Sequence, residues 1–199
     1  LKENSIKILG KEIDKKIISN IRGLSIDMIN KANSGHPGIA LGAAPILYTL
    51  FAKVLKISRE NPKWISRDRF ILSAGHGSSL LYSLLFYLDY LKLDDLKNFR
   101  SLNSKTPGHP EIETLGVEMS TGPLGQGIAS SVGFAIAEKY LSNYFNDDVI
   151  NYKTYCLVGD GDLKEGVALE AMSIAGNLAL NNLIVLYDSN EITLDGSLY

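Results

Sequence analysis

The sequence predicts an α/β fold in which a mostly parallel sheet carries helices on both faces. Three short apolar runs, at residues 69–73, 154–158 and 183–187, have the length and composition of buried strands. Longer segments with helical periodicity lie before the first run and between the runs. Strands that alternate with helices in this way are typical of a parallel sheet covered on both sides.

The first half of the chain is predicted to be helical around a single strand. Apolar residues recur every three or four positions from Ile13 to Ala32, and a glycine-rich turn at residues 33–38 ends that helix. Gly75 ends the first predicted strand. The helices predicted in this half are residues 12–32, 41–55, 78–91 and 94–99.

The second half begins with a long loop and continues as alternating helices and strands. Residues 101–127 contain three prolines and five glycines, which predicts a loop, and long loops in compact domains are often functional. Residues 127–144 and 164–180 are predicted helices. Because no helix follows the strand at 183–187 to cover it, we expect the chain to be a fragment of a longer protein.

Composition excludes several classes of protein. Twenty Lys and Arg against 22 Asp and Glu give a net charge of −2, so the basic surface of a nucleic-acid binder is absent. The longest nearly apolar run, residues 38–52, is too short to span a membrane and contains Pro45. We therefore expect neither a nucleic-acid nor a membrane partner. The single cysteine, Cys156, cannot form an internal disulfide, which makes a cytoplasmic location the default, with a removed leader left open.

All three histidines, His36, His76 and His109, directly follow a glycine. Glycine allows tight turns and close backbone approach, and histidine can transfer protons near neutral pH. One such histidine usually satisfies its own loop by hydrogen bonding, but three in the same setting predict a functional site. A zinc site made of the three imidazoles is the competing interpretation. Their wide spacing, without a short ligand pair, gives zinc no specific support.

A carboxylate between two glycines, Gly159-Asp160-Gly161, follows the second predicted strand. Open α/β sheets bind ligands at the carboxyl ends of their strands. Because Asn190 follows the next strand, Asp160 and Asn190 would converge as oxygen ligands of Mg²⁺ or Ca²⁺, and Mg²⁺ in turn suggests a phosphorylated ligand. A Gly-Asp-Gly turn without an ion is the alternative.

The remaining motifs are less specific. Residues 122–127, Gly-Pro-Leu-Gly-Gln-Gly, are either a ligand-binding loop or a turn that allows close helix packing. A dinucleotide fingerprint at Gly159 is only weakly supported, since Lys164 stands in place of its third glycine. Glu165 and Glu170 lie on one predicted helix, about 140° apart around its axis, so they cannot form an acid pair by themselves. Cys156 is expected to be a packing residue inside a strand.

Taken together, these motifs strongly resemble the transketolase family. The stretch from Asp160 to Asn190 alone is typical of thiamine diphosphate enzymes in general, and the three glycine-histidine turns narrow the resemblance to transketolase-like members. It covers essentially all of residues 1–199, as most of the family's N-terminal diphosphate-binding domain, and it implies the thiamine-diphosphate-binding fold. The segments that carry it are residues 35–38, 72–77, 105–111, 121–127 and 159–190.

The resemblance implies that thiamine diphosphate and a divalent cation, Mg²⁺ or Ca²⁺, are the cofactors. Asp160, the side chain of Asn190 and the backbone carbonyl of Ile192 would bind the metal, and Gly161 would donate to the diphosphate. The cofactor would further be lined by His76, Gly122, Pro123 and Leu124 and contacted by Asn190.

The implied reaction moves a two-carbon ketol unit from a ketose phosphate to an aldose phosphate through a thiamine diphosphate carbanion, as in the pentose phosphate pathway. His36 and His109 would be catalytic, because they would face the substrate and assist proton transfers. Glu165 and Glu170 would belong to a carboxylate network at the interface of a homodimer. The chain alone is expected to be inactive, because other cofactor-binding residues of the family would lie beyond Tyr199.

Two positions depart from the family pattern. Ala74 stands where Asn is common, and Asp162 would add negative charge near the metal, but neither removes an implied ligand. Two alternatives within the enzyme class are the N-terminal piece of a split transketolase-like enzyme and a relative such as dihydroxyacetone synthase. An alternative of another class is a non-catalytic interaction module that retains the fold, and the intact histidines, Asp160 and Asn190 argue against it.

Overall fold

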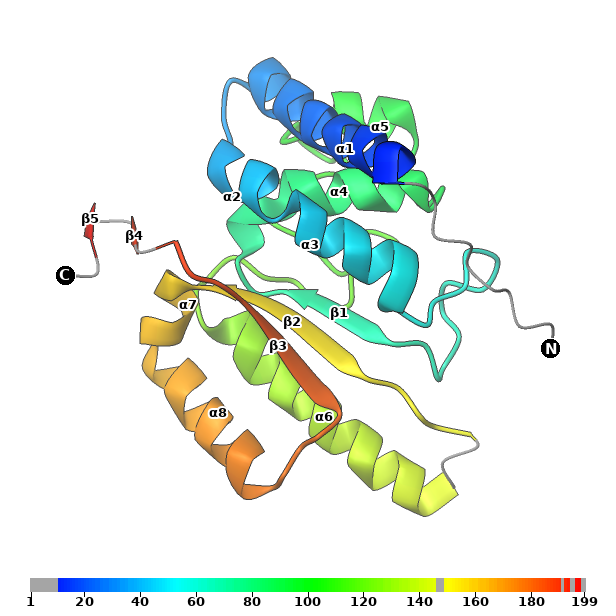
Figure 1. The fold of residues 1–199 in the computed structure, drawn as a ribbon, viewed down its shortest axis with the longest axis vertical. Coiled ribbons are helices and arrows are strands. Elements are labelled where there is room, and N and C mark those ends of the chain that lie inside the picture. The colour runs from blue at the N-terminus through cyan, green and yellow to red at the C-terminus, as the bar shows by residue number, and fades with distance from the viewer. Residues whose placement is uncertain (1–10, 146–148, 191, 194–195, 198–199) are drawn as a thin grey trace.

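A three-stranded parallel sheet, in the order β1-β2-β3, forms the centre of the protein (Figure 1). The computed structural model describes residues 11–145, 149–190, 192–193 and 196–197. The strands are β1 (Arg69–Leu72), β2 (Thr154–Gly159) and β3 (Leu183–Asp188), with a separate antiparallel pair of β4 (Ile192–Thr193) and β5 (Gly196–Ser197). The predicted α/β class and mostly parallel sheet are confirmed.

Helices cover both faces of this sheet, as predicted (Figure 1). One face carries α1 (Lys11–Ala32), α2 (Pro37–Gly42), α3 (Ala44–Thr49), a π-helical segment (Leu50–Val54), α4 (Ser78–Tyr87) and α5 (Leu93–Lys97). The other face carries α6 (Gln126–Phe145) and α8 (Gly166–Asn177), and the short α7 (Asp160–Lys164) follows β2. Among the described residues, no helix is long and apolar enough to cross a membrane.

The two faces of β2 feed different hydrophobic clusters, as the two-residue period of a strand requires. Tyr155 and Leu157 pack into the cluster under α1 to α5, whereas Cys156 and Val158 pack against α6 and α8. Cys156 is completely buried, and burial raises the pKa of its thiol to about 12. The prediction that Cys156 is a packing residue is therefore confirmed.

Three predicted helices have different limits in the structure. Residues 41–55 do not form one helix, because Pro45 lacks an N–H group and a new helix, α3, begins beside it. The helix predicted at 78–91 ends at Tyr87, because Asp89 adopts a left-handed backbone with φ of 61°. The helix predicted at 164–180 begins only at Gly166, because the backbone of Glu165 is extended, and it ends at Asn177; Lys164 belongs to the preceding α7.

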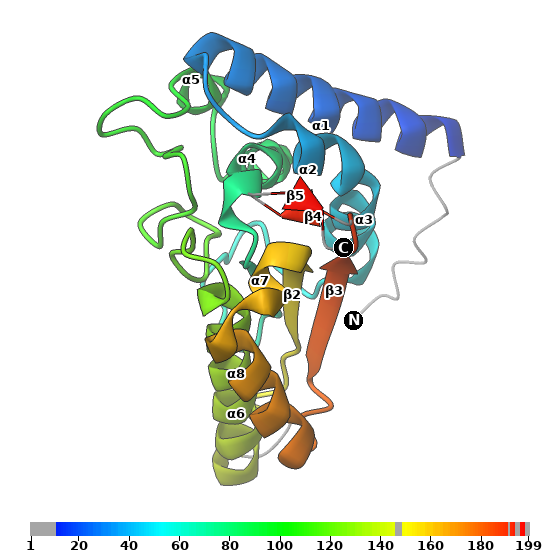
Figure 2. The ribbon, with the colours of Figure 1, turned by 90° about the vertical axis from the view of Figure 1, so that its left-hand side faces the viewer.

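The parallel register brings the ends of all three strands to one edge of the sheet. Leu72 of β1 pairs with Leu157 of β2, and Gly159 of β2 pairs with Asp188 of β3. The segments that follow the strands therefore meet there, and Figure 2 shows α7 above the end of β2. The predicted long loop contains neither helix nor strand over residues 101–125 of the described chain.

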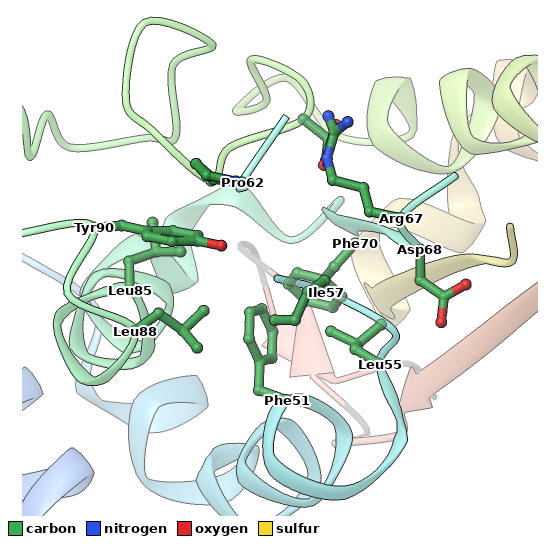
Figure 3. A pocket seen from close by; sticks show the side chains of 12 residues that line it. Phe51, Leu55, Ile57, Pro62, Arg67, Asp68, Phe70, Leu85, Leu88 and Tyr90 are labelled. Atoms are coloured by element: carbon green, nitrogen blue, oxygen red, sulfur yellow. The ribbon is translucent and has the colours of Figure 1, made fainter. Parts of the chain in front are cut away.

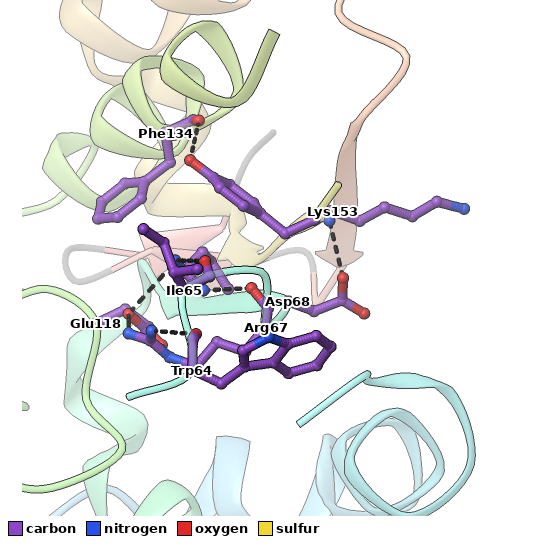
Figure 4. A network of polar contacts seen from close by, with 9 residues as sticks. Trp64, Ile65, Arg67, Asp68, Glu118, Phe134 and Lys153 are labelled. Carbon is purple, nitrogen blue, oxygen red and sulfur yellow. Dashed lines mark hydrogen bonds and ion pairs between the residues drawn. The ribbon is translucent and has the colours of Figure 1, made fainter. Parts of the chain in front are cut away.

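A polar network holds the opposite edge, where β1 and β2 begin (Figure 4). The carboxylate of Asp68 is 2% exposed and accepts hydrogen bonds of 2.8 Å from the backbone N–H groups of Lys56 and Lys153. Arg67 donates two hydrogen bonds, of 2.9 and 2.7 Å, to Glu118. A buried carboxylate with backbone donors thus fixes this edge.

A small cavity lies beside β1 in the layer formed by α1 to α5 (Figure 3). Mostly apolar side chains line it, among them Phe51, Phe70 and Leu85. Its volume is about 20 Å³, which is room for about one water molecule. A ligand larger than a water molecule therefore needs a different site.

Helix α6 meets the end of β1 at Gly127. A Cβ atom on Gly127 would lie 2.4 Å from the Cα of Ser73 and 2.7 Å from its Cβ. Such a contact with backbone is far inside van der Waals distance, so only glycine permits this approach. The interpretation of residues 122–127 as a turn that allows close helix packing is supported at this position.

We predict that Gly127→Ala lowers the free energy of unfolding by about 1–3 kcal/mol, the usual cost of overpacking. Gly133→Ala is the matched control, because Gly133 lies in the same helix, is exposed, and a Cβ there would have nothing within 4 Å. This control should gain roughly 0.4–1 kcal/mol from helix propensity and lower unfolded-state entropy. Urea unfolding of both variants checks the prediction, and equal effects would contradict it.

Candidate functional site

A cleft of about 390 Å³ opens at the edge where the parallel strands end. Segments that are far apart in the sequence contribute to it, which is the usual position of ligand sites in open α/β sheets. The lining residues are His36, His76, His109, Gly122, Leu124, Gly159, Asp160, Gly161, Asp162 and Asn190.

The structure brings the three predicted histidines together in this cleft. His36 precedes α2, His76 lies in the tight turn after β1, and His109 lies in the long loop. The rings of His36 and His76 meet edge to face, with 5.1 Å between their centroids. Gly122 has φ of 152° and packs against His109, so that a Cβ there would lie 3.2 Å from the imidazole Cγ.

The cleft favours a neutral His76. Burial lowers the pKa of His76 below its usual value of 6.5, and the neighbouring His36 and His109 lower it further. The negative charges of Asp162 and Asp188 act in the opposite direction but are weaker than burial. At neutral pH the imidazole of His76 is therefore uncharged and offers one donor and one acceptor.

His36 has a cationic neighbour that the sequence did not single out. Burial lowers the pKa of His36, and the charge of Arg100 is the second cause. Arg100 also donates a hydrogen bond to the hydroxyl of Ser34, two residues before His36. Its backbone has a left-handed φ of 61°. No sequence signal marks a non-glycine residue in that conformation.

Asp160 lies at the floor of the cleft, 4% exposed, at the start of α7. One carboxylate oxygen accepts a hydrogen bond from the Tyr187 hydroxyl, and the other accepts a hydrogen bond of 2.9 Å from the backbone N–H of Asn190. The predicted meeting of Asp160 and Asn190 is thus present in the structure. Tyr187 is a second site residue that sequence reasoning missed, because its place in an apolar strand suggested packing.

The donors at this end of the sheet suit a hard cation. Asp160 supplies carboxylate oxygens, and Asn190, which also lines the cleft, carries an amide oxygen. Ile192 lies in β4, which is close to α7. Among the described residues, no three His, Cys, Asp or Glu side chains are grouped to hold a metal ion. A cation here would therefore need amide, carbonyl or ligand oxygens as well as Asp160.

The predicted loop residues and glutamates take different positions. Gly122 and Leu124 line the cleft, whereas Pro123 between them is exposed and lies outside the lining. Glu165 and Glu170 are both exposed, but they do not share a helix as predicted, because Glu165 caps α8 and Glu170 lies inside it.

Comparison with known proteins places this geometry in a family. Residues 13–199 match the family described as transketolase, thiamine diphosphate binding domain. The transketolase of Bacillus subtilis is 58% identical over 191 residues, which are 94% of this chain and 29% of that protein. The chain thus spans less than a third of the relative's length.

Solved structures agree with the sequence comparison. A transketolase from Campylobacter jejuni superposes with a TM-score of 0.89 and 53% identity, over 94% of this chain and 30% of that one. A transketolase from Pichia stipitis, solved in complex with sedoheptulose 7-phosphate, superposes with a TM-score of 0.89 and 48% identity, over 93% and 28% of the respective chains.

We predict that His76 makes stability depend on pH in the cofactor-free protein. Below about pH 6.5 the unfolded chain binds a proton at this position that the native protein binds only at lower pH, so stability is lost as the pH falls. The free energy of unfolding of the wild type minus that of His76→Asn should be constant above pH 6.5. This difference should decrease as the pH falls from 6.5 to 5. Chemical denaturation at several pH values checks this, and a difference that grows as the pH falls would contradict it.

Proposed function

The chain belongs to the transketolase family, as a thiamine diphosphate binding domain, and we propose that its cleft holds the metal and diphosphate end of that cofactor. The observation that carries the proposal is the meeting of Asp160 and Asn190 with three histidines in one cleft. No single loop accounts for that grouping, because the residues come from segments that are far apart in the sequence, from His36 to Asn190.

The donor set fits the cofactor. Asp160 and the side chain of Asn190, with the carbonyl of Ile192, would hold Mg²⁺ or Ca²⁺, a cation that would supply positive charge for binding a diphosphate. Gly161 would donate its N–H to the diphosphate, and a Cβ at that position would lie 3.1 Å from Leu124. The absence of a side chain there keeps the floor of the cleft open. His76, Gly122 and Leu124, which line the cleft, would surround the cofactor.

The histidines would manage protons on the substrate side. Thiamine diphosphate, when bound, supplies the electron sink for breaking and forming the carbon–carbon bond of a ketol transfer. His36 and His109 would hold and transfer protons at substrate hydroxyl groups. The lowered pKa of His36 leaves its imidazole neutral and able to accept a proton at neutral pH. A ketose phosphate would be the donor and an aldose phosphate the acceptor.

The full-length protein would act as a homodimer in the cytoplasm. This chain carries the diphosphate end of the proposed site, and the remainder of the cofactor would be held by parts outside it. Glu165 and Glu170 are exposed and would join a carboxylate network between two subunits. The enzyme would act in the pentose phosphate pathway.

We predict that Asp160→Ala in the full-length protein abolishes binding of thiamine diphosphate in the presence of Mg²⁺. The reason is that the variant removes the carboxylate proposed to join the cation to the floor of the cleft. Asp94→Ala is the control, because Asp94 is an exposed carboxylate on α5. Isothermal titration calorimetry measures both, and an unchanged affinity in Asp160→Ala would refute the metal assignment.

His36→Ala and His109→Ala should affect turnover more than cofactor binding. Groups that transfer protons typically contribute ~10²–10⁴-fold, and we expect a loss of turnover in that range for each variant of the full-length protein. Affinity for thiamine diphosphate should stay within a few-fold of wild type. Steady-state kinetics with xylulose phosphate and ribose phosphate checks the prediction. Near-normal turnover in both variants would show that these two turns are structural.

A further inference from the structure

We propose that Asp162 is a positioning residue that holds three cofactor-facing segments in place and does not itself bind the cation. The inference rests on the proposed function, since it concerns how the same cleft is built. The sequence suggested only that Asp162 adds negative charge beside a metal. The structure assigns it a different set of partners.

The carboxylate of Asp162 is among the most enclosed polar groups of the described chain, with 1% of the residue exposed. Its Oδ1 accepts hydrogen bonds from the Ser73 hydroxyl at 2.7 Å and from the backbone N–H of Gly125 at 2.9 Å. Its Oδ2 accepts one from the backbone N–H of Gly159 at 3.0 Å. Three donors thus satisfy one buried charge, as burial of a carboxylate requires.

These donors come from three different segments. Ser73 directly follows β1, and His76 comes three residues later. Gly125 directly follows the loop of Gly122 and Leu124 and directly precedes α6. Gly159 is the last residue of β2, next to Asp160. Each donor is therefore within three residues of a group that lines the cleft.

Ser73 also connects this group of hydrogen bonds to helix α6. Its hydroxyl oxygen accepts a hydrogen bond of 3.1 Å from the backbone N–H of Ile128, in the first turn of α6. The close contact between Gly127 and Ser73 lies beside that bond. One chain of hydrogen bonds, from Gly159 through Asp162 and Ser73 to Ile128, therefore joins β2, β1 and α6.

The arrangement has a consequence for binding. If Asp162 loses one acceptor oxygen, a backbone N–H or the Ser73 hydroxyl becomes a buried donor without a partner, and the segment that carries it moves to find one. Displacement of about 1 Å at a site of this kind has a large effect on ligand affinity. Asp162→Asn keeps the size of the side chain and replaces one acceptor by a donor.

The protein offers a matched control at the other edge of the sheet. Asp68 is also a buried carboxylate and also accepts two backbone N–H bonds, but it ties together the starts of β1 and β2 (Figure 4). Asp68→Asn repeats the same chemical change away from the cleft. If the role of Asp162 were purely structural, both variants would change the affinity for thiamine diphosphate by the same factor.

The test measures affinity for thiamine diphosphate by calorimetry at saturating Mg²⁺, and the melting temperature without cofactor, in the full-length protein. We expect Asp162→Asn to weaken binding at least 10-fold and to lower turnover at saturating cofactor by a clearly smaller factor. Asp162→Asn and Asp68→Asn should lower the melting temperature by comparable amounts. Asp68→Asn should change the affinity for thiamine diphosphate by less than 2-fold. Equal affinities in wild type and Asp162→Asn, or an equal loss in both variants, would overturn the proposal.

Two further measurements keep the outcomes distinct. If Asp162→Asn does not fold, Ser73→Ala removes one donor from the same carboxylate and should weaken binding at least 3-fold in a folded protein, whereas unchanged binding overturns the inference. If Asp162→Asn loses both affinity and all turnover at saturating cofactor and metal, Asp162 acts directly in the chemistry, which also overturns it. Failure of the wild-type protein to bind thiamine diphosphate would instead refute the proposed function.

Discussion

The parallel pairing of β1, β2 and β3 is the constraint on which the whole cleft depends. Parallel strands all end at one edge, so the residues that follow them meet without any other device. Ser73, Asp160 and Asn190 follow the three strands in turn, although the chain between the first and the last exceeds half of the sequence. Reversal of any one strand would send its last residue to the edge that Asp68 occupies.

Glycines then set how closely the loops at that edge approach one another. A Cβ at Gly75 would lie 2.8 Å from the backbone nitrogen of Gly122, and a Cβ at Gly125 would lie 2.6 Å from the Cβ of Glu165. Side chains at these positions would push the turn of His76 away from the long loop, and that loop away from the start of α8. Gly75, beside His76, and Gly125, before α6, therefore have a packing reason, whatever the cleft binds.

The sequence allowed prediction of the parts that depend on local pattern. Apolar runs located all three strands, and a carboxylate and an amide at consecutive strand ends predicted that Asp160 and Asn190 would meet. It did not reveal the roles that depend on distant neighbours. Asp162 accepts hydrogen bonds from Ser73 and Gly125, which lie 89 and 37 residues away in the sequence. Tyr187 has the sequence setting of a core residue, but its hydroxyl donates a hydrogen bond to Asp160.

Asp160 and Asp162 are neighbouring carboxylates with different surroundings. Both are buried and only one residue separates them, so two negative charges share a region of low polarity, which is costly without compensation. Asp162 is compensated by three donors from its own protein framework. Asp160 accepts from a tyrosine hydroxyl and a backbone N–H, which are dipoles, and it faces the cleft. In the proposed function a divalent cation binds at Asp160, and the fixed Asp162 would keep the turn in the shape that receives it.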